Sequence, residues 1–277
     1  MGFHAQLERS WEASGSMLCV GLDPDLSRIP AMLGTGPAAI ERFCLEIVEA
    51  TAEVACAFKP QIAYFASAGA EPQLERICDH IRTEHPDVTL ILDAKRGDIG
   101  STASHYAREA FDRYGAHAVT VNPYMGTDSI EPFLAHRTAD GDAGGVILLC
   151  RTSNPGGDDF QSIVSNTEAG SKPFFVHVAE RVANEWSRLG DCALVVGATY
   201  PTELAEVRSI VGELPLLVPG VGAQGGDAAT VMEHGASASG RGLIVSSSRA
   251  ILYASSGDDF ADAAHSEAQR TAASLAL

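Results

Sequence analysis

Basic residues are scarce in this sequence. The chain of 277 residues carries 19 Lys and Arg against 36 Asp and Glu, a formal net charge of −17. Nucleic acids and anionic membrane surfaces attract Lys and Arg, so this balance argues against both as partners. It does not exclude a small phosphorylated ligand, because such a site needs only local positive potential.

Long apolar runs and a secretory leader are also missing. No run reaches the length of a transmembrane helix, and residues 1–15 are polar without an apolar signal core. The six cysteines are scattered, mostly inside apolar segments, and none forms a C-x-x-C pair. Such cysteines are typical of small buried side chains in a reducing compartment rather than of disulfides or a zinc site. We therefore expect a cytoplasmic protein.

Motifs for metal ions and dinucleotides are absent as well. The nine histidines form neither H-x-H nor H-E-x-x-H, so we expect no metal ion. Residues 21–25 follow the first apolar segment, and they lack the G-x-G-x-x-G turn of a dinucleotide-binding fold. No other stretch indicates a cofactor site, and we expect no cofactor.

What the sequence does contain is a regular alternation of short apolar segments and longer amphipathic ones. Eight segments are predicted as strands: 17–22, 54–58, 88–92, 118–121, 145–150, 193–196, 216–218 and 243–245. Eight β/α units without a break in composition predict a TIM (β/α)8 barrel, with residues 1–277 forming a single domain. The Gly/Asp-rich stretches 138–145 and 154–172 are predicted to be a surface loop and a long active-site loop.

Polar residues follow seven of the eight predicted strands, at the end where TIM barrels carry their active sites. The strongest cluster, residues 93–98, follows the third strand. Side chains alternate along a strand, so Asp93 and Lys95 should share one face. Gly97 should then turn the chain outward, leaving Asp98 poorly placed to pair with Lys95 of its own chain. The alternative is that Asp98 caps a helix beginning near Ser101.

The last two strands are followed by features of a phosphate site. Residues 219–227 are rich in glycine, which brings backbone N–H groups close to an anion. Arg249 can clamp a phosphate through two hydrogen bonds, and Gln224 can add a neutral donor. An ordinary glycine-rich turn beside a surface arginine is the alternative interpretation.

The run D-A-K-R-G-D-I-G-S-T at 93–102 resembles the motif of the orotidine 5'-phosphate decarboxylase family, in its bacterial type 2 branch. The stretches S-N-P-G at 153–156 and P-G-V-G-A-Q-G-G at 219–226 resemble further motifs of this family. The resemblance implies decarboxylation of orotidine 5'-phosphate to UMP in pyrimidine biosynthesis, without a cofactor. It also implies a homodimer with shared active sites.

Individual roles follow from the same resemblance. Lys95 looks like the proton donor, held between Asp93 and Asp98. Lys59 and Asp23 look like the residues that bind the ribose, with Lys59 extending the charge network. The remaining matches are Ser153 for the pyrimidine, Pro219, Gln224 and Arg249 for the phosphate, and Asp98, Ile99 and Thr102 for contacts across a dimer interface. The roles of Asn122 and Arg151 stay open.

Two other functions remain as alternatives. Metal-dependent sugar-phosphate decarboxylases and hexulose-phosphate synthases have a related D-x-K-x-x-D strand end, although the G-D-I-G-S-T continuation favours the pyrimidine enzyme. A non-catalytic phosphate-ligand sensor on the same barrel could dispense with Asp93, Lys95 and Asp98, yet this chain retains all three.

Overall fold

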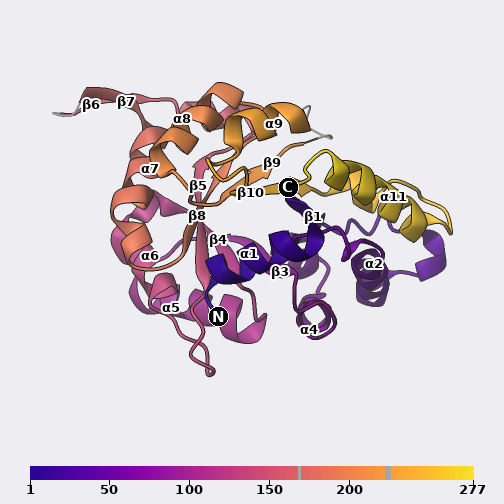
Figure 1. Cartoon of the computed structure of the whole chain (residues 1–277). Coiled ribbons are helices and arrows are strands. Elements are labelled where there is room, and N and C mark those ends of the chain that lie inside the picture. The colour runs from indigo at the N-terminus through magenta and orange to yellow at the C-terminus, as the bar shows by residue number, and fades with distance from the viewer. Residues whose placement is uncertain (168–169, 222–225) are drawn as a thin grey trace.

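The computed structural model describes residues 1–167, 170–221 and 226–277. Eight parallel strands close into a barrel in the order β1-β10-β9-β8-β5-β4-β3-β2, which confirms the predicted TIM barrel (Figure 1). The barrel strands are β1 Leu18–Leu22, β2 Ala57–Pro60, β3 Thr89–Arg96, β4 Ala118–Val121, β5 Gly145–Arg151, β8 Cys192–Val196, β9 Leu216–Pro219 and β10 Leu243–Ser247. Every predicted strand is present, although β2 begins at Ala57 rather than at residue 54, and β3 continues to Arg96.

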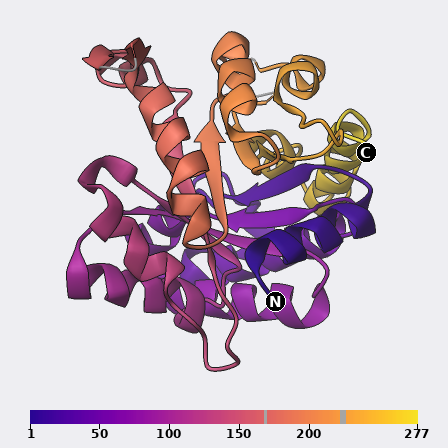
Figure 2. The same ribbon diagram turned by 60° about the vertical axis from the view of Figure 1, so that its left-hand side comes forward.

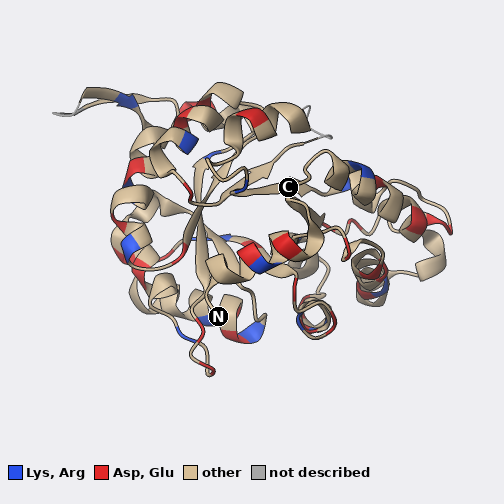
Figure 3. Cartoon of the chain, viewed as in Figure 1, with Lys and Arg blue, Asp and Glu red and all other residues tan. Residues whose placement is uncertain are grey.

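The strands read as continuous apolar runs because both of their faces are covered. Every residue of β1 and β8 is buried, as expected for parallel strands between a filled barrel and a layer of helices. The six cysteines are all buried and none forms a disulfide, which confirms their predicted role as small core side chains. Figure 3 shows most acidic and basic residues on the outer helices and loops.

The helices surround the barrel in chain order (Figures 1 and 2). They are α1 Phe3–Ser14, α2 Gly36–Thr51, α3 Ile62–Ser67, α4 Glu71–Glu84, α5 Gly100–Arg108, α6 Thr127–Leu134, α7 Phe174–Asn184, α8 Pro201–Val211, α9 Ala228–Gly235, α10 Arg249–Leu252 and α11 Phe260–Ala273. A π-helical turn, η2 Glu109–Arg113, extends α5. Short 3-10 turns are η1 Ala31–Leu33, η3 Pro123–Met125, η4 Pro155–Asp159 and η5 Trp186–Arg188. Within the described part of the chain, no helix is long and apolar enough to span a membrane.

Helix α1 closes the N-terminal end of the barrel. Trp11 Nε1 donates a hydrogen bond of 2.9 Å to the Leu243 carbonyl at the start of β10. The Ser10 hydroxyl lies 2.8 Å from that of Thr89 at the start of β3. Phe3 fills the space above Gly145 so closely that a Cβ on this glycine would lie 2.3 Å from the ring. This end is therefore a packed part of the core.

The segment predicted as one long loop at 154–172 contains more structure than expected. It begins with η4 and continues into an antiparallel pair, β6 Val164–Thr167 and β7 Gly170–Pro173, which projects from the body (Figures 1 and 2). Ser, Asn, Gly and Lys make up most of these two strands, a composition typical of loops. The pairing of the strands with each other, which the local composition does not reveal, creates the hairpin.

Candidate active site

The end of β3 is irregular, and this irregularity shapes the site. Leu92 pairs with Val119 of β4, but the next pair is Arg96 with Val121, so β3 carries two extra residues over this stretch. Lys95 has a φ of 47°, the only positive φ of a residue other than glycine in the described chain. Such residues cluster at functional sites, because only strong surrounding contacts maintain the left-handed conformation. The convergence of Asp93 and Lys95 thus comes from a bulge, and not from the regular alternation that we predicted.

Asp93 is the centre of a buried charge network. Its Oδ2 accepts a hydrogen bond of 3.0 Å from Lys59 Nζ, and its Oδ1 accepts one of 2.6 Å from Lys95 Nζ. The side chain of Lys95 is 47% exposed, whereas those of Asp93 and Lys59 are 10% and 7% exposed. One lysine is therefore enclosed in the barrel, and the other reaches from the same carboxylate into the open mouth.

The charges in this network reinforce one another. Burial alone would raise the pKa of Asp93, but the charges of Lys59 and Lys95 and their hydrogen bonds hold it well below its usual range. Burial would lower the pKa of Lys59, but the charges of Asp93 and Asp23 outweigh it and hold the pKa above its usual value. The network stays ionised in spite of its burial.

Asp23, directly after β1, faces the same region. Its Oδ2 accepts a hydrogen bond of 2.6 Å from the Ser248 hydroxyl, at the end of β10. Its Oδ1 is buried and has no hydrogen-bond partner in the described part of the chain. Buried carboxylate oxygens normally have partners, so this atom is suited to accept a hydrogen bond from a ligand.

Asp98, Ile99 and Thr102 lie beyond the network. The Asp98 carboxylate accepts a hydrogen bond of 2.8 Å from the N–H of Ile99, and within the described residues it forms no ion pair with Lys95. Helix α5 begins at Gly100 with Ile99 as its N-cap and no side-chain cap, so the alternative that Asp98 caps this helix is wrong. Ile99 is 48% exposed, and Thr102 is exposed as well.

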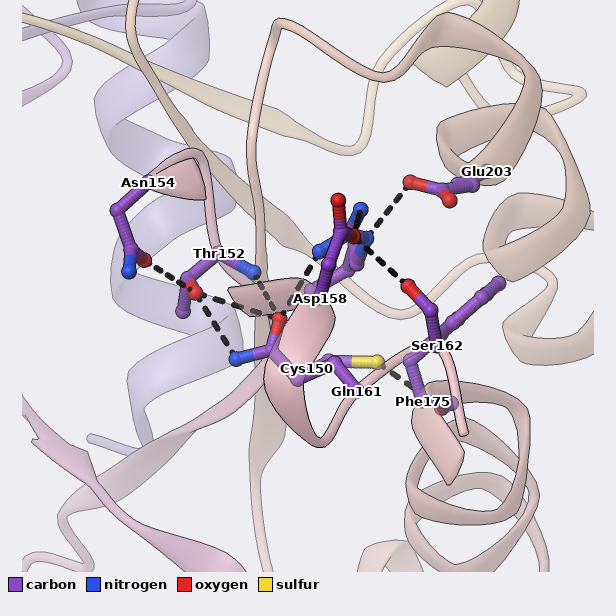
Figure 4. A network of polar contacts seen from close by, with 9 residues as sticks. Cys150, Thr152, Asn154, Asp158, Gln161, Ser162, Phe175 and Glu203 are labelled. Carbon is purple, nitrogen blue, oxygen red and sulfur yellow. Dashed lines mark hydrogen bonds and ion pairs between the residues drawn. The ribbon is translucent and has the colours of Figure 1, made fainter. Parts of the chain in front are cut away.

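Arg151, whose role was open, anchors the loop after β5 through Asp158 and Glu203, both of which are labelled in Figure 4. Although only 1% exposed, it donates hydrogen bonds to Asp158 at 2.6 Å and to Glu203 at 2.7 Å. Ser153 lies on this loop, and a Cβ on Gly197 would come within 2.8 Å of its Cα. Arg151 and Gly197 therefore fix the backbone that carries Ser153.

Asn122 also has a local role. Its Oδ1 accepts a hydrogen bond of 3.0 Å from the N–H of Tyr124 and so caps η3. Arg96, within the predicted cluster, pairs with Glu109 through two hydrogen bonds and packs on the Tyr106 ring. Both side chains therefore shape the strand ends and lie outside the charge network.

The predicted phosphate loops are described in part. Pro219 ends β9, and Arg249 is the exposed first residue of α10, after β10. Gln224 lies outside the described residues. Asp227, at the end of the predicted loop, accepts a hydrogen bond from the N–H of Thr230 and caps α9.

Thr120 also belongs to the site, although the sequence did not predict it. This residue of β4 is 1% exposed, and its hydroxyl contacts Asp93 and the N–H groups of Ala94 and Lys95 within the bulge. The available signal was a polar residue inside the apolar run 118–121. That signal was weak, because threonine is common in strands.

These features define a class of protein: a (β/α)8-barrel enzyme with a buried lysine–aspartate network at the mouth of its barrel. Comparison with known proteins gives the family. Residues 16–264 match the orotidine 5'-phosphate decarboxylase / HUMPS family, and the chain belongs to this family.

Named relatives agree with this assignment. The chain is 55% identical over 271 residues to an orotidine 5'-phosphate decarboxylase of Janthinobacterium sp. (strain Marseille), covering 98% of this chain and 97% of the relative. It is 58% identical over 265 residues to the Bordetella pertussis enzyme of the same name, covering 95% and 94%. The structure of Leishmania donovani OMP decarboxylase superposes with a TM-score of 0.82 at 34% identity, covering 99% of both chains.

Proposed function

We propose that this protein removes CO₂ from orotidine 5'-phosphate to give UMP, with Lys95 as the proton donor. The observation that carries the mechanism is the position of Lys95. It is fixed by the buried Asp93 carboxylate while its Nζ reaches the mouth of the barrel. The high identity to enzymes named orotidine 5'-phosphate decarboxylase supports the reaction.

The reaction breaks the bond between C6 of the pyrimidine and its carboxylate. CO₂ leaves, and the electron pair stays on C6, where the ring offers no conjugated acceptor for it. A positive charge already fixed beside C6 stabilises this carbanion without reorganisation. Lys95 then transfers a proton from Nζ to C6, which completes UMP, and regains a proton from water.

Asp93 and Lys59 keep this charge in place. Asp93 orients Lys95, while Lys59 neutralises the second oxygen of the carboxylate. Repulsion between an aspartate and the substrate carboxylate could add to the rate as CO₂ leaves, but we rank this effect below charge stabilisation.

The other residues bind the substrate in this proposal. The unpartnered Oδ1 of Asp23 suits a ribose hydroxyl, and Lys59 lies beside it in the network. Ser153 would bond the pyrimidine. Pro219, Gln224 and Arg249 would hold the phosphate, whose binding energy helps to close the site over the reacting atoms.

We further propose a homodimer in which Asp98, Ile99 and Thr102 reach the neighbouring site. The exposed Ile99, together with Tyr124 and Met125 after β4, supports a covered apolar face at these strand ends. A twofold interface would bring each Asp98 to the partner's Lys95.

Two features of the whole chain complete the proposal. We place residues 1–277 in one domain, since two backbone hydrogen bonds join the segment after α1 to the segment after α11. The N–H of Met17 donates to the Leu275 carbonyl, and the N–H of Leu277 donates to the Gly15 carbonyl. The six buried free thiols support a cytoplasmic location.

The activity is tested by following ultraviolet absorbance of orotidine 5'-phosphate with purified protein. We expect consumption with formation of UMP, equally fast with and without EDTA. Loss of activity in EDTA, restored by a divalent ion, would favour the metal-dependent sister enzymes. No consumption under either condition would overturn the proposal.

Subunit mixing tests the shared site. Lys95→Ala and Asp98→Ala homodimers should each be nearly inactive, whereas a mixed dimer has one site with both lesions and one intact site. After verified subunit exchange, activity should return to about a quarter of wild type per total subunit. No recovery would mean that each site belongs to one subunit.

A further inference from the structure

Thr120 occupies the point where the bulge of β3 meets the charge network. Its Oγ1 lies 2.9 Å from Asp93 Oδ1, 3.0 Å from the N–H of Ala94 and 2.9 Å from the N–H of Lys95. A hydroxyl has one donor and two acceptor lone pairs. Donation to the carboxylate and acceptance from the two N–H groups use all three.

These contacts replace the ladder hydrogen bonds that the bulge removes. Ala94 and Lys95 fall between the strand pairs Leu92–Val119 and Arg96–Val121, so their N–H groups have no regular ladder partner on β4. The Thr120 hydroxyl takes the place of that partner for both groups. It also binds the same Asp93 oxygen that Lys95 Nζ contacts.

We propose that Thr120 is a positioning residue for decarboxylation, a role that rests on the proposed function. It keeps the Lys95 backbone in its left-handed conformation and turns Asp93 Oδ1 toward Lys95 Nζ. One buried hydroxyl thereby holds both the backbone of Lys95 and the carboxylate oxygen to which Lys95 Nζ binds.

A pair of substitutions separates the hydroxyl from the side-chain volume. Thr120→Val keeps the shape but leaves two N–H groups and a carboxylate oxygen without their partner. We expect its kcat to fall by about 10²-fold, with KM changed much less, since misplacing a charged donor affects the transition state most. Thr120→Ser keeps the hydroxyl and should retain kcat to within about threefold.

Thr89→Val is the matched control. Thr89 is buried on β3, the strand that carries Lys95, and its hydroxyl bonds Ser10 at the opposite end of the barrel. This variant should lower the melting temperature and leave kcat near wild type. A kcat loss in Thr120→Val no larger than in Thr89→Val, or no rescue by serine, would overturn the proposal.

Wild-type protein without turnover would refute the proposed function instead. In that case crystal structures of the Thr120→Val and Thr120→Ser variants decide the positioning role. Lys95 should leave its left-handed conformation in the valine variant only, and an unchanged Lys95 in both would reject the role.

A second site lies on the outer helix layer, where Glu49, His80 and His85 converge. His80 Nε2 lies 2.6 Å from Glu49 Oε1, and His85 Nε2 lies 3.0 Å from the same oxygen. The three candidate ligand atoms lie within 4.8 Å of one another. Among the described residues, no other group of three His, Cys, Asp or Glu meets this spacing.

The fold holds these side chains in place. Glu49 is on α2 and His80 on α4, and these helices pack against the barrel through buried residues such as Ile47 and Ile77. His85 follows α4 as its C-cap, outside helical geometry, which returns its ring toward that of His80 with 5.9 Å between centroids.

The histidine spacing in the sequence predicted no metal ion, because these three side chains meet only through the packing of two helices. We infer that Glu49, His80 and His85 bind a borderline divalent ion such as Zn²⁺, with water completing the coordination. Two imidazoles and one carboxylate are a donor set that zinc accepts. The site joins two outer helices and is separate from the charge network of the barrel mouth. Binding of the ion would stabilise the contact between α2 and α4 and would leave decarboxylation unchanged.

Calorimetry with Zn²⁺ and the visible spectrum with Co²⁺ test this site in untagged, EDTA-treated protein. We expect one ion per chain and binding at least about tenfold weaker in His80→Ala and in His85→Ala. His136→Ala is the matched control, because His136 forms a single pair with Asp112 at 2.8 Å without a second histidine. The inference would be overturned if Zn²⁺ did not bind saturably. It would also be overturned if the variant with both His80→Ala and His85→Ala bound Zn²⁺ as tightly as the wild type.

Discussion

The two ends of the barrel are built from the same eight strands, yet α1 covers one end and the other end carries the charge network. At the N-terminal end, Trp11 and Ser10 satisfy their polar atoms within the fold, and Phe3 packs against Gly145. At the C-terminal end, Asp23 Oδ1 lacks a partner in the described chain, and Lys95 reaches toward solvent from a left-handed backbone.

The two ends of the barrel thus contribute to different properties, one to stability and the other to chemistry. Burying paired polar atoms and apolar rings contributes to the free energy of unfolding. A fixed charge beside an open mouth contributes instead to binding and to the transition state. Substitutions at the N-terminal end should therefore lower the free energy of unfolding with little effect on kcat. Substitutions at the C-terminal end should lower kcat or ligand affinity with little effect on stability.

The largest effect should come from Lys95→Ala. Removing the proton donor should lower kcat by about 10³-fold or more, because both charge stabilisation and proton transfer are lost. Asp93 keeps its pair with Lys59, so the melting temperature and the affinity for UMP should change little. Steady-state kinetics, thermal melting and calorimetry measure the three quantities. Near-normal turnover by the folded variant would remove Lys95 from the mechanism.

Trp11→Ala should give the converse result at the closed end. Losing a buried indole that also bonds Leu243 should lower the free energy of unfolding by about 3–5 kcal/mol. Denaturant unfolding measures this change, and kcat should stay near wild type at a temperature where the variant is folded. A large loss of kcat in the folded variant would contradict the separation of the two ends.

Arg249→Ala should weaken binding without loss of stability. An exposed arginine that clamps a phosphate should contribute about 10²-fold to the affinity for UMP. Affinity for uridine, which lacks the phosphate, should hardly change. Calorimetry with UMP and with uridine measures the two affinities. An equal loss of affinity for both ligands would mean that the phosphate does not bind at Arg249.

The smallest change, counted per pH unit, concerns His117 at the closed end. Burial and nearby arginines lower the pKa of His117 from 6.5 to about 4, and its Nδ1 accepts a hydrogen bond from the N–H of Leu90. Between these two values the unfolded chain binds more protons than the folded chain. Stability should therefore fall as the pH drops from 6.5 toward 4, by up to about 1.4 kcal/mol per pH unit.

His117→Asn keeps a hydrogen-bond acceptor and removes the titrating ring. The free energy of unfolding of this variant should depend less on pH over that interval, as measured by urea unfolding at several pH values. An identical pH dependence in the variant and the wild type would show that other groups control it.

The sequence predicted more at the level of elements than at the level of contacts. The eight strands could be predicted because parallel strands that are buried on both faces are short, apolar and separated by helices. The β6–β7 hairpin could not, since its strands are polar and pair only with each other. The start of α5 was predicted near Ser101 and lies one residue earlier, at Gly100, although the helix has no side-chain cap.

For the site, the residues that carry charge at the strand ends can be identified from the sequence alone, because side-chain chemistry and position after a strand are local properties. The sequence placed Asp23, Lys59, Asp93 and Lys95 at one end of a barrel. How these four side chains contact one another depends on the tertiary structure. The bulge in β3, the three contacts of Thr120 and the pairing of Arg151 with Glu203 all depend on partners from other strands and helices. Those partners lie many residues away, and local sequence patterns hold no information about their distances.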